Sequence, residues 1–278
     1  MTRARKRFGQ NFLERDWVHK VVDAIAPGPG QFFIEVGPGR GALTGPLAAR
    51  AAHVLAFEID RDLSAALQAT APPNVTVVEG DFLSVTADRL RAALPAGAWA
   101  QPFRVAGNLP YNVASPILFA LVRLNTSGLS LADATVMLQR EVADRLLAGP
   151  GSREYGVLSV LMQYSADVER LLNLPPGAFR PSPKVHSALV RLRFRDPAVP
   201  ARDPVLFAAL VQAVFTRRRK TMANALLAYQ PAQPIGDRPR PPSPADALAR
   251  AGLDGRRRPE TLAVADFVRL ADAFHAPP

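Results

Sequence analysis

Glycines and acidic residues stand directly after short apolar runs in the first third of the sequence. The segment EVGPGRG (35–41) ends one such run, and its glycines allow the backbone to turn sharply and to approach a ligand closely. Glu58 ends the next run, where a carboxylate can accept both hydroxyl groups of a ribose. Asp81 follows the third run and is placed to accept the amine of an adenine. Together they predict a nucleotide-type ligand, although ordinary turns and helix-capping carboxylates are the alternative for each motif alone.

A further motif, Asn108-Leu109-Pro110-Tyr111, follows the fourth apolar run. Pro110 fixes its own φ and biases Leu109 away from helix, so the Leu109 carbonyl is presented beside the amide oxygen of Asn108. Two adjacent acceptors suit an exocyclic amine, and Tyr111 offers an aromatic face to a planar base. The alternative is a helix-initiating turn capped by Asn108.

Five apolar runs alternate with helical patterns before residue 150, which predicts a parallel, doubly wound sheet. Two later extended runs, 166–174 and 186–194, have no helix between them and predict an antiparallel edge pair, giving seven strands. The expected strands of the parallel part are 31–36, 53–59, 74–78, 103–106 and 134–138, and the expected helices are 16–26, 41–52, 61–70, 87–94, 115–122, 139–147 and 155–164.

The sequence changes character after Phe194, where only helical patterns remain. They predict helices over 204–215, 217–228, 244–251 and 261–273. The proline-rich stretch 229–245 predicts an extended loop. We therefore expect an α/β domain over 1–195 and a small all-α domain over 196–278.

The net charge of +10 is concentrated at the two ends of the chain. Residues 1–20 carry six Lys/Arg and two acidic residues. Residues 21–178 carry eleven Lys/Arg and fourteen acidic residues, and residues 179–278 carry seventeen Lys/Arg and eight acidic residues. Basic ends around a slightly acidic body predict attraction of a nucleic acid. Arginine-rich solvated surface is the alternative interpretation.

Several classes of protein are disfavoured by composition. The chain has no cysteine, which removes disulfides, thiol catalysis and thiolate metal sites, and its 4 histidines lack metal-ligand spacing. No apolar run reaches the roughly 18 residues of a membrane helix, and no signal peptide is predicted. We expect a cytoplasmic, monomeric protein that binds neither a metal nor a membrane.

The tetrad 108–111, preceded by an E-x-G-x-G-x-G loop, resembles S-adenosylmethionine-dependent methyltransferases that act on amino groups of nucleic acid bases. Nine segments in order resemble, more specifically, the small-subunit ribosomal RNA adenine N6,N6-dimethyltransferase (KsgA) family, which has a Rossmann-like sheet. The segments are RKRFGQNFL (5–13), EVGPGRGALT (35–44), FEIDRDL (57–63), GD (80–81), GNLPYN (107–112), MLQREVADRL (137–146), YGVLSV (155–160), FRPSPKVHSALVRL (179–192) and RRRKTMANAL (217–226).

This resemblance implies methyl transfer from S-adenosylmethionine to adenine N6 in small-subunit (16S) ribosomal RNA, within a precursor of the 30S subunit. It implies that Tyr111 and Phe179 sandwich the target adenine, while Asn108 and the Leu109 carbonyl hold its amine. The residues implied to bind the cofactor are Asn11, Leu13, Gly37, Gly39, Glu58, Asp81 and Asn108, and those implied to bind RNA are Arg217, Arg218, Arg219 and Lys220.

Other functions share parts of this pattern. A large-subunit ribosomal RNA methyltransferase of the antibiotic-resistance type would share the cofactor loop and the QNFL segment (10–13). A non-catalytic ribosome-assembly or transcription factor could use the same fold, although the intact Asn108, Tyr111, Glu58 and Asp81 disfavour it. A nicotinamide dehydrogenase fits poorly, because the third glycine of its fingerprint would come one residue early.

Overall fold

The computed structural model describes residues 11–94, 101–229 and 242–274. The chain divides into two compact units, one made of Met1–Ala143 with Asp167–Arg195 and the other of Asp144–Ala166 with Asp196–Pro278. One segment of the first unit ends at residue 195. The segment 144–166 groups with the second unit, whereas sequence analysis assigned it to the first.

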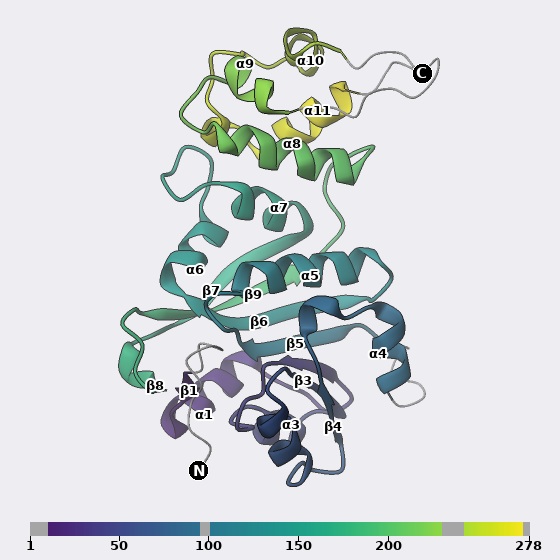
Figure 1. Ribbon diagram of the computed structural model, residues 1–278, viewed down its shortest axis with the longest axis vertical. Helices are drawn as coiled ribbons and strands as arrows, with labels where there is room; N and C mark the ends of the chain where they lie inside the picture. The colour runs from purple at the N-terminus through teal and green to yellow at the C-terminus, as the bar shows by residue number, and fades with distance from the viewer. Residues whose placement is uncertain (1–10, 95–100, 230–241, 275–278) are drawn as a thin grey trace. The chain divides into compact units, whose positions relative to one another are not determined.

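The first unit contains a seven-stranded sheet in the order β4-β3-β2-β5-β6-β9-β7 (Figure 1). The five strands β2 to β6 pair in parallel, and β9 runs antiparallel to β6. This confirms the predicted Rossmann-like α/β fold. The strands are β2 (Phe32–Val36), β3 (His53–Glu58), β4 (Val75–Glu79), β5 (Phe103–Asn108), β6 (Leu131–Gln139), β7 (Ala166–Leu174) and β9 (Ser187–Phe194).

Helices between these strands lie close to their predicted positions. Asp60 is the predicted N-cap of α3, and its side chain accepts the amide hydrogens of Asp62 and Leu63. The predicted helix 41–52 is shorter, because a turn through Gly41 delays the start of α2 until Thr44. The helices are α1 (Arg15–Ile25), α2 (Thr44–Ala48), α3 (Arg61–Gln68), α4 (Ala87–Ala93), α5 (Ala114–Thr126) and α6 (Arg140–Leu147).

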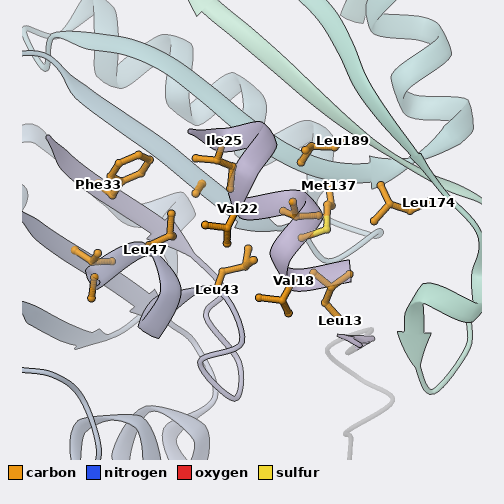
Figure 2. Packing of buried hydrophobic residues seen from close by; sticks show 14 of the residues in the cluster. Leu13, Val18, Val22, Ile25, Phe33, Leu43, Leu47, Met137, Leu174 and Leu189 are labelled. Atoms are coloured by element: carbon orange, nitrogen blue, oxygen red, sulfur yellow. The ribbon is translucent and has the colours of Figure 1, made fainter. Parts of the chain in front are cut away.

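One face of the sheet is covered by α1 and α2 (Figure 2). Val22 and Ile25 of α1 and Leu47 of α2 are buried with residues from the strands, Phe33 among them. Burying such apolar side chains stabilises the unit by about 1.5–3 kcal/mol for each large one. The core therefore fixes α1, and with it the residues that directly precede α1.

Two arginines from the sheet hold the end of α1. The guanidinium of Arg104 donates to the carbonyls of Ile25 and Ala26 at 2.7 and 2.9 Å, and it pairs with Asp133 at 2.8 Å. Arg191 donates to the carbonyl of Ala24. Positive charge and hydrogen-bond donors both suit the carboxyl end of a helix. This buried network was not predicted, since pairs so distant in sequence leave no local pattern.

A separate pair of two-residue strands was also not predicted. β1 (Phe12–Leu13) pairs antiparallel with β8 (Phe179–Arg180), and Leu13 lies opposite Phe179. The amide of Glu14 donates to the carbonyl of Ala178 at 2.8 Å. Its carboxylate pairs with Arg180 at 2.9 Å. These contacts hold the segment before α1 against the segment that leads into β9.

Within the described residues, the second unit is helical beyond residue 196, as predicted. Its helices are α7 (Val157–Ser165), α8 (Pro204–Thr216), α9 (Met222–Ala225), α10 (Pro244–Ala251) and α11 (Val264–Ala273). Aromatic contacts join them: the rings of Tyr164 and Phe207 have centroids 4.5 Å apart, and those of Phe215 and Phe267 lie 5.8 Å apart.

The predicted helix 217–228 is wrong in its first part. The amide of Lys220 donates to the carbonyl of Arg217 at 2.8 Å, which closes a turn, and α9 begins only at Met222. Much of the proline-rich stretch, residues 230–241, lies outside the described residues. Within the described ranges, no helix has the length and apolar character needed to cross a membrane.

Candidate active site

The parallel strands of the first unit end at one edge of the sheet, and a cavity of about 250 Å³ lies there. Val36 pairs with Phe57 on one side and with Gly107 on the other, so the turns that follow β2, β3 and β5 start level with one another. Sheets of this type bind ligands at this edge. The predicted residues that line the cavity are Asn11, Leu13, Gly37, Gly39, Glu58, Asp81, Asn108, Leu109 and Tyr111.

The turn after β2 uses glycine where the backbone requires it. Gly37 has a φ of +69°, a conformation that other residues rarely adopt, and its amide donates to the carbonyl of Phe57 at 2.9 Å. A Cβ on Gly37 would lie 3.8 Å from the carbonyl oxygen of Asn108. The turn thus leaves its backbone accessible to a ligand beside Asn108.

Glu58 is tied to the same turn. Its Oε2 accepts the amide hydrogen of Gly39 at 2.9 Å, and its Oε1 accepts that of Asp60 at 2.9 Å. The residue is 5% exposed, and this burial raises the pKa of the carboxyl, while the two backbone hydrogen bonds lower it. Each carboxylate oxygen can accept more than one hydrogen bond, so the pair of hydroxyls of a ribose would still find acceptors.

Asp81 serves as a cap in the structure. Its Oδ1 accepts the amide hydrogen of Leu83 at 2.9 Å, at the start of the short helix η2 (Phe82–Ser84). Asp81 also lines the cavity. The capping alternative is therefore observed, and the predicted contact to a cofactor adenine stays a prediction.

Asn108 has its amide fixed by the N-terminal segment. Its Nδ2 donates to the main-chain carbonyl of Asn11 at 2.6 Å, so the nitrogen must be the atom on that side and Oδ1 remains the acceptor. Beside it, the amide of Leu109 donates to the carbonyl of Met137 at 3.2 Å. The two acceptors expected from the sequence, Asn108 Oδ1 and the Leu109 carbonyl, thus belong to a turn anchored on β6.

Tyr111 is half-buried at the end of the same turn. Its phenolic oxygen lies 2.8 Å from the hydroxyl of Ser187, the first residue of β9. Burial raises the pKa of the Tyr111 phenol, and the hydrogen bond with Ser187 lowers it. The phenol therefore stays neutral near pH 7 and leaves its ring as the feature that a base would contact.

The sequence matches a known protein family over most of its length. Residues 1–235 match the family model described as ribosomal RNA adenine dimethylase. The chain belongs to the ribosomal RNA adenine dimethylase family. A protein of Aromatoleum aromaticum named ribosomal RNA small subunit methyltransferase A is 43% identical to this chain, over 99% of this chain and 95% of that protein. A protein of the same name from Xanthomonas campestris pv. campestris is 44% identical, over 97% of this chain and 95% of that protein.

Solved structures of similar fold include a dimethyladenosine transferase from Plasmodium falciparum. It has a TM-score of 0.73 at 22% identity and covers 93% of this chain and 95% of its own. The 23S rRNA methyltransferase ErmE has a TM-score of 0.62 at 27% identity, and the match covers 95% of this chain and 99% of the ErmE chain. Both confirm the fold of this dimethylase-family member.

One predicted member of the site lies elsewhere. Phe179 is 0% exposed, is not among the residues that line the cavity, and packs in the apolar core with Leu13 and Leu174. In the structure, Phe179 is therefore a core residue. Stacking of Phe179 on a target adenine stays a prediction, and it requires the ring to become accessible from the cavity.

Sequence analysis missed several residues of this dimethylase-family site, and two of them carry chemistry, Phe12 and Glu35. Phe12 lines the cavity, its ring lies 3.2 Å from the position of a Cβ on Gly39, and the guanidinium of Arg40 lies 4.1 Å above its centre. Glu35 also lines the cavity, is 1% exposed, and has no described partner for its Oε2. Burial raises the pKa of Glu35 to about 7; the Thr44 hydroxyl opposes this rise, and Glu58 adds a smaller increase. A carboxylate inside the apolar run FFIEV was the signal that could have singled it out.

The predicted RNA-binding residues lie in the second unit. Arg217, Arg219 and Lys220 are exposed. Arg218 instead donates from Nη2 to the carbonyl of Ser152 at 3.1 Å and lies 4.0 Å from the carboxylate of Glu260. The basic run thus divides: Arg218 is half-buried against Ser152 and Glu260, whereas Arg219 and Lys220 are exposed and Arg217 is exposed with a 3.4 Å hydrogen bond to the carbonyl of Asn224.

Proposed function

We propose that this chain methylates the N6 of adenines in small-subunit ribosomal RNA twice, using S-adenosylmethionine, and so forms N6,N6-dimethyladenosine. One observation carries the proposal: a buried carboxylate suited to a ribose and an oriented asparagine oxygen line the same cavity. The names of relatives 41–44% identical to this chain support the small subunit as the substrate.

The residues of the cavity fit S-adenosylmethionine. Glu58 offers acceptors to ribose hydroxyls, and at Gly37 a Cβ would meet only the carbonyl oxygen of Asn108, at 3.8 Å, which leaves room beside the turn. The unpartnered Oε2 of Glu35 suits the ammonium group of the methionine part. Asn11 and Leu13 would cover that part, and Asp81 would bind the adenine. When bound, S-adenosylmethionine supplies a methyl group on a positively charged sulfur.

The chemistry of the chain itself is directed at the target amine. The lone pair of N6 is delocalised into the adenine ring, so the free amine is a poor nucleophile. In the first transfer, Asn108 Oδ1 and the Leu109 carbonyl would accept its two hydrogens, which favours a pyramidal nitrogen with its lone pair available; in the second transfer, one hydrogen remains for either acceptor. Positive charge that develops on N6 then meets two preorganised acceptors. The charged product amine is acidic and loses its proton to water, so no strong base is needed.

The ribosomal RNA would contact the second unit through its exposed basic residues. Arg217, Arg219 and Lys220 provide charge for phosphates, and binding through them would weaken with salt. A target base that starts stacked must leave the stack, at a cost of a few kcal/mol. We propose that residues 196–278 serve as this RNA-binding domain, and that the enzyme acts as a monomer on a precursor of the small subunit.

The deciding experiment incubates the purified chain with unmodified small or large ribosomal subunits and labelled S-adenosylmethionine. Mass analysis of nucleosides should find N6,N6-dimethyladenosine in small-subunit RNA alone. Label in large-subunit RNA alone would favour the antibiotic-resistance type of enzyme, whose fold is shared. Cofactor binding without any labelled RNA would favour a non-catalytic assembly factor.

A further inference from the structure

The hydroxyl of Ser187 is a buried polar group that forms a hydrogen bond with the side chain of Tyr111. Ser187 is 2% exposed, and its Oγ lies 2.8 Å from the phenolic oxygen of Tyr111. Buried hydroxyls normally require a partner. By contrast, the hydroxyl of Ser64, 1% exposed in α3, has no hydrogen-bond partner within the described part of the chain. The two serines therefore form a matched pair for experiment.

The topology of the sheet explains how Ser187 reaches Tyr111. Parallel strands all end at the edge that holds the cavity, and only an antiparallel strand can begin there. β9 is antiparallel to β6, and its first residue, Ser187, lies opposite Gln139, the last residue of β6. The antiparallel strand thus brings a side chain from late in the sequence to the turn that follows β5.

Tyr111 is restrained at both of its ends. At the backbone, Pro110 has a fixed φ, and Leu109 is hydrogen-bonded to Met137. The remaining freedom is rotation of the side chain about two bonds, and the hydrogen bond from the far end of the ring to Ser187 restricts it. A ring held in one orientation loses little conformational entropy when a base stacks on it.

We propose that Ser187 is a positioning residue that holds the aromatic face of Tyr111 for the target adenine. The proposal rests on the function proposed above. In the proposed role, Ser187 does not contact the substrate and acts only through Tyr111. A merely structural serine would instead affect folding, cofactor binding and RNA binding together.

The test compares Ser187→Ala, Tyr111→Phe and the double variant with the Ser64→Ala control. We measure kcat and KM for small-subunit RNA, the Kd of S-adenosylmethionine and the melting temperature. Each single variant should raise the KM for RNA about 3- to 10-fold, as expected for one lost hydrogen bond. The Kd of S-adenosylmethionine should stay within about twofold, and Ser64→Ala should match wild type. The double variant should equal either single one, because both changes remove the same bond.

Three outcomes overturn the proposal: a wild-type KM in Ser187→Ala, fold-changes that multiply in the double variant, or a parallel loss of cofactor affinity and melting temperature. Failure of the proposed function is distinguishable, because the wild-type protein would then leave small-subunit RNA unmethylated in the same assay.

Discussion

The side-chain amide of Asn108 donates a 2.6 Å hydrogen bond to the main-chain carbonyl of Asn11. This bond joins the turn after β5 to the segment before α1. It determines which atom of the amide faces away from that segment, and so the acceptor Oδ1 is oriented before any substrate binds. Preorganised dipoles of this kind need no reorganisation during a reaction.

Replacing Asn108 by alanine should lower single-turnover methylation about 10²- to 10³-fold, because the transition state loses a preorganised acceptor. Calorimetry should still detect S-adenosylmethionine, since Glu58 and the turn through Gly37 are intact. The exposed Asn173 of β7 offers a control, and Asn173→Ala should retain wild-type rates. Turnover of Asn108→Ala within tenfold of wild type would remove Asn108 from the mechanism.

Gly107→Ala should destabilise the first unit, because the added Cβ would lie 2.5 Å from the carbonyl oxygen of Val36. β2 and β5 would have to separate at the edge that holds the cavity, at a cost of about 1–3 kcal/mol. Denaturant unfolding measures this loss, and the affinity for S-adenosylmethionine should fall with it.

Gly45 in α2 is the matched control, since a Cβ there meets no atom within 4 Å. Gly45→Ala should leave the free energy of unfolding equal or raise it by up to about 1 kcal/mol. Equal stability of the two alanine variants would show that the sheet absorbs the extra methyl group.

Glu35→Gln should stabilise the unliganded protein at pH 8. Burial raises the pKa of Glu35 from its ordinary value of 4.5 to about 7, so the folded state holds a proton that the unfolded state releases. Stability is then lost as the pH rises between these values, and the full penalty at pH 8 is on the order of 3 kcal/mol. Glutamine cannot ionise and escapes this loss.

Unfolding by denaturant at pH 5 and pH 8 checks the prediction for Glu35→Gln. Most of the gain should be present at pH 8 and little of it at pH 5. The affinity for S-adenosylmethionine at pH 8 should decrease, because a carboxylate is missing. The same stability difference at both pH values would mean that Glu35 does not titrate in this range.

The fold was predictable where local patterns and burial agree. Apolar runs identified β2 to β6, because parallel strands are covered on both faces. The small pair of β1 and β8 was not predictable, because Leu13 and Phe179 are far apart in sequence and two residues carry no periodicity. The turn at Arg217–Lys220 was not predicted, because arginine and lysine have high helix propensity and the local sequence therefore indicated a helix.

The candidate site was predictable as a set of residues but not as a set of contacts. Glu58 and Asn108 stand in motifs that sequence spacing reveals, and both line the cavity. Their hydrogen-bond partners are backbone atoms, the amide of Gly39 and the carbonyl of Asn11. Every residue has such atoms, so the sequence does not indicate which of them will form these bonds. Ser187 was likewise invisible, since its role depends on the direction in which β9 runs.

Arg219→Gln should weaken binding of small-subunit RNA and lower its salt dependence, with a slope reduced by about 0.7–0.9 for each lost phosphate contact. The exposed Arg250 of α10 is the control for the same loss of charge in the same unit. Filter binding at several salt concentrations measures both. Equal effects of Arg219→Gln and Arg250→Gln would mean that net charge, rather than the basic turn, attracts the RNA.

Arg218→Gln should behave differently from Arg219→Gln. It removes the hydrogen bond to the carbonyl of Ser152 and the ion pair with Glu260, so the melting temperature should fall. RNA affinity measured well below that temperature should change less than in Arg219→Gln. The opposite ranking would assign Arg218 to the RNA contact.

The pairing of β1 with β8 also joins an early segment of the chain to one that is synthesised much later. A nascent chain exposes the glycine turn and Asn108 early, but Phe179 and Ser187 leave the ribosomal exit tunnel only after two thirds of the sequence has been translated. Until then Leu13 lacks its opposite strand and Tyr111 its hydroxyl partner. A partly made chain therefore has Asn108 and Leu109 but lacks β8, which pairs with β1, and Ser187, which holds Tyr111. Any truncation before β9 should yield an inactive product.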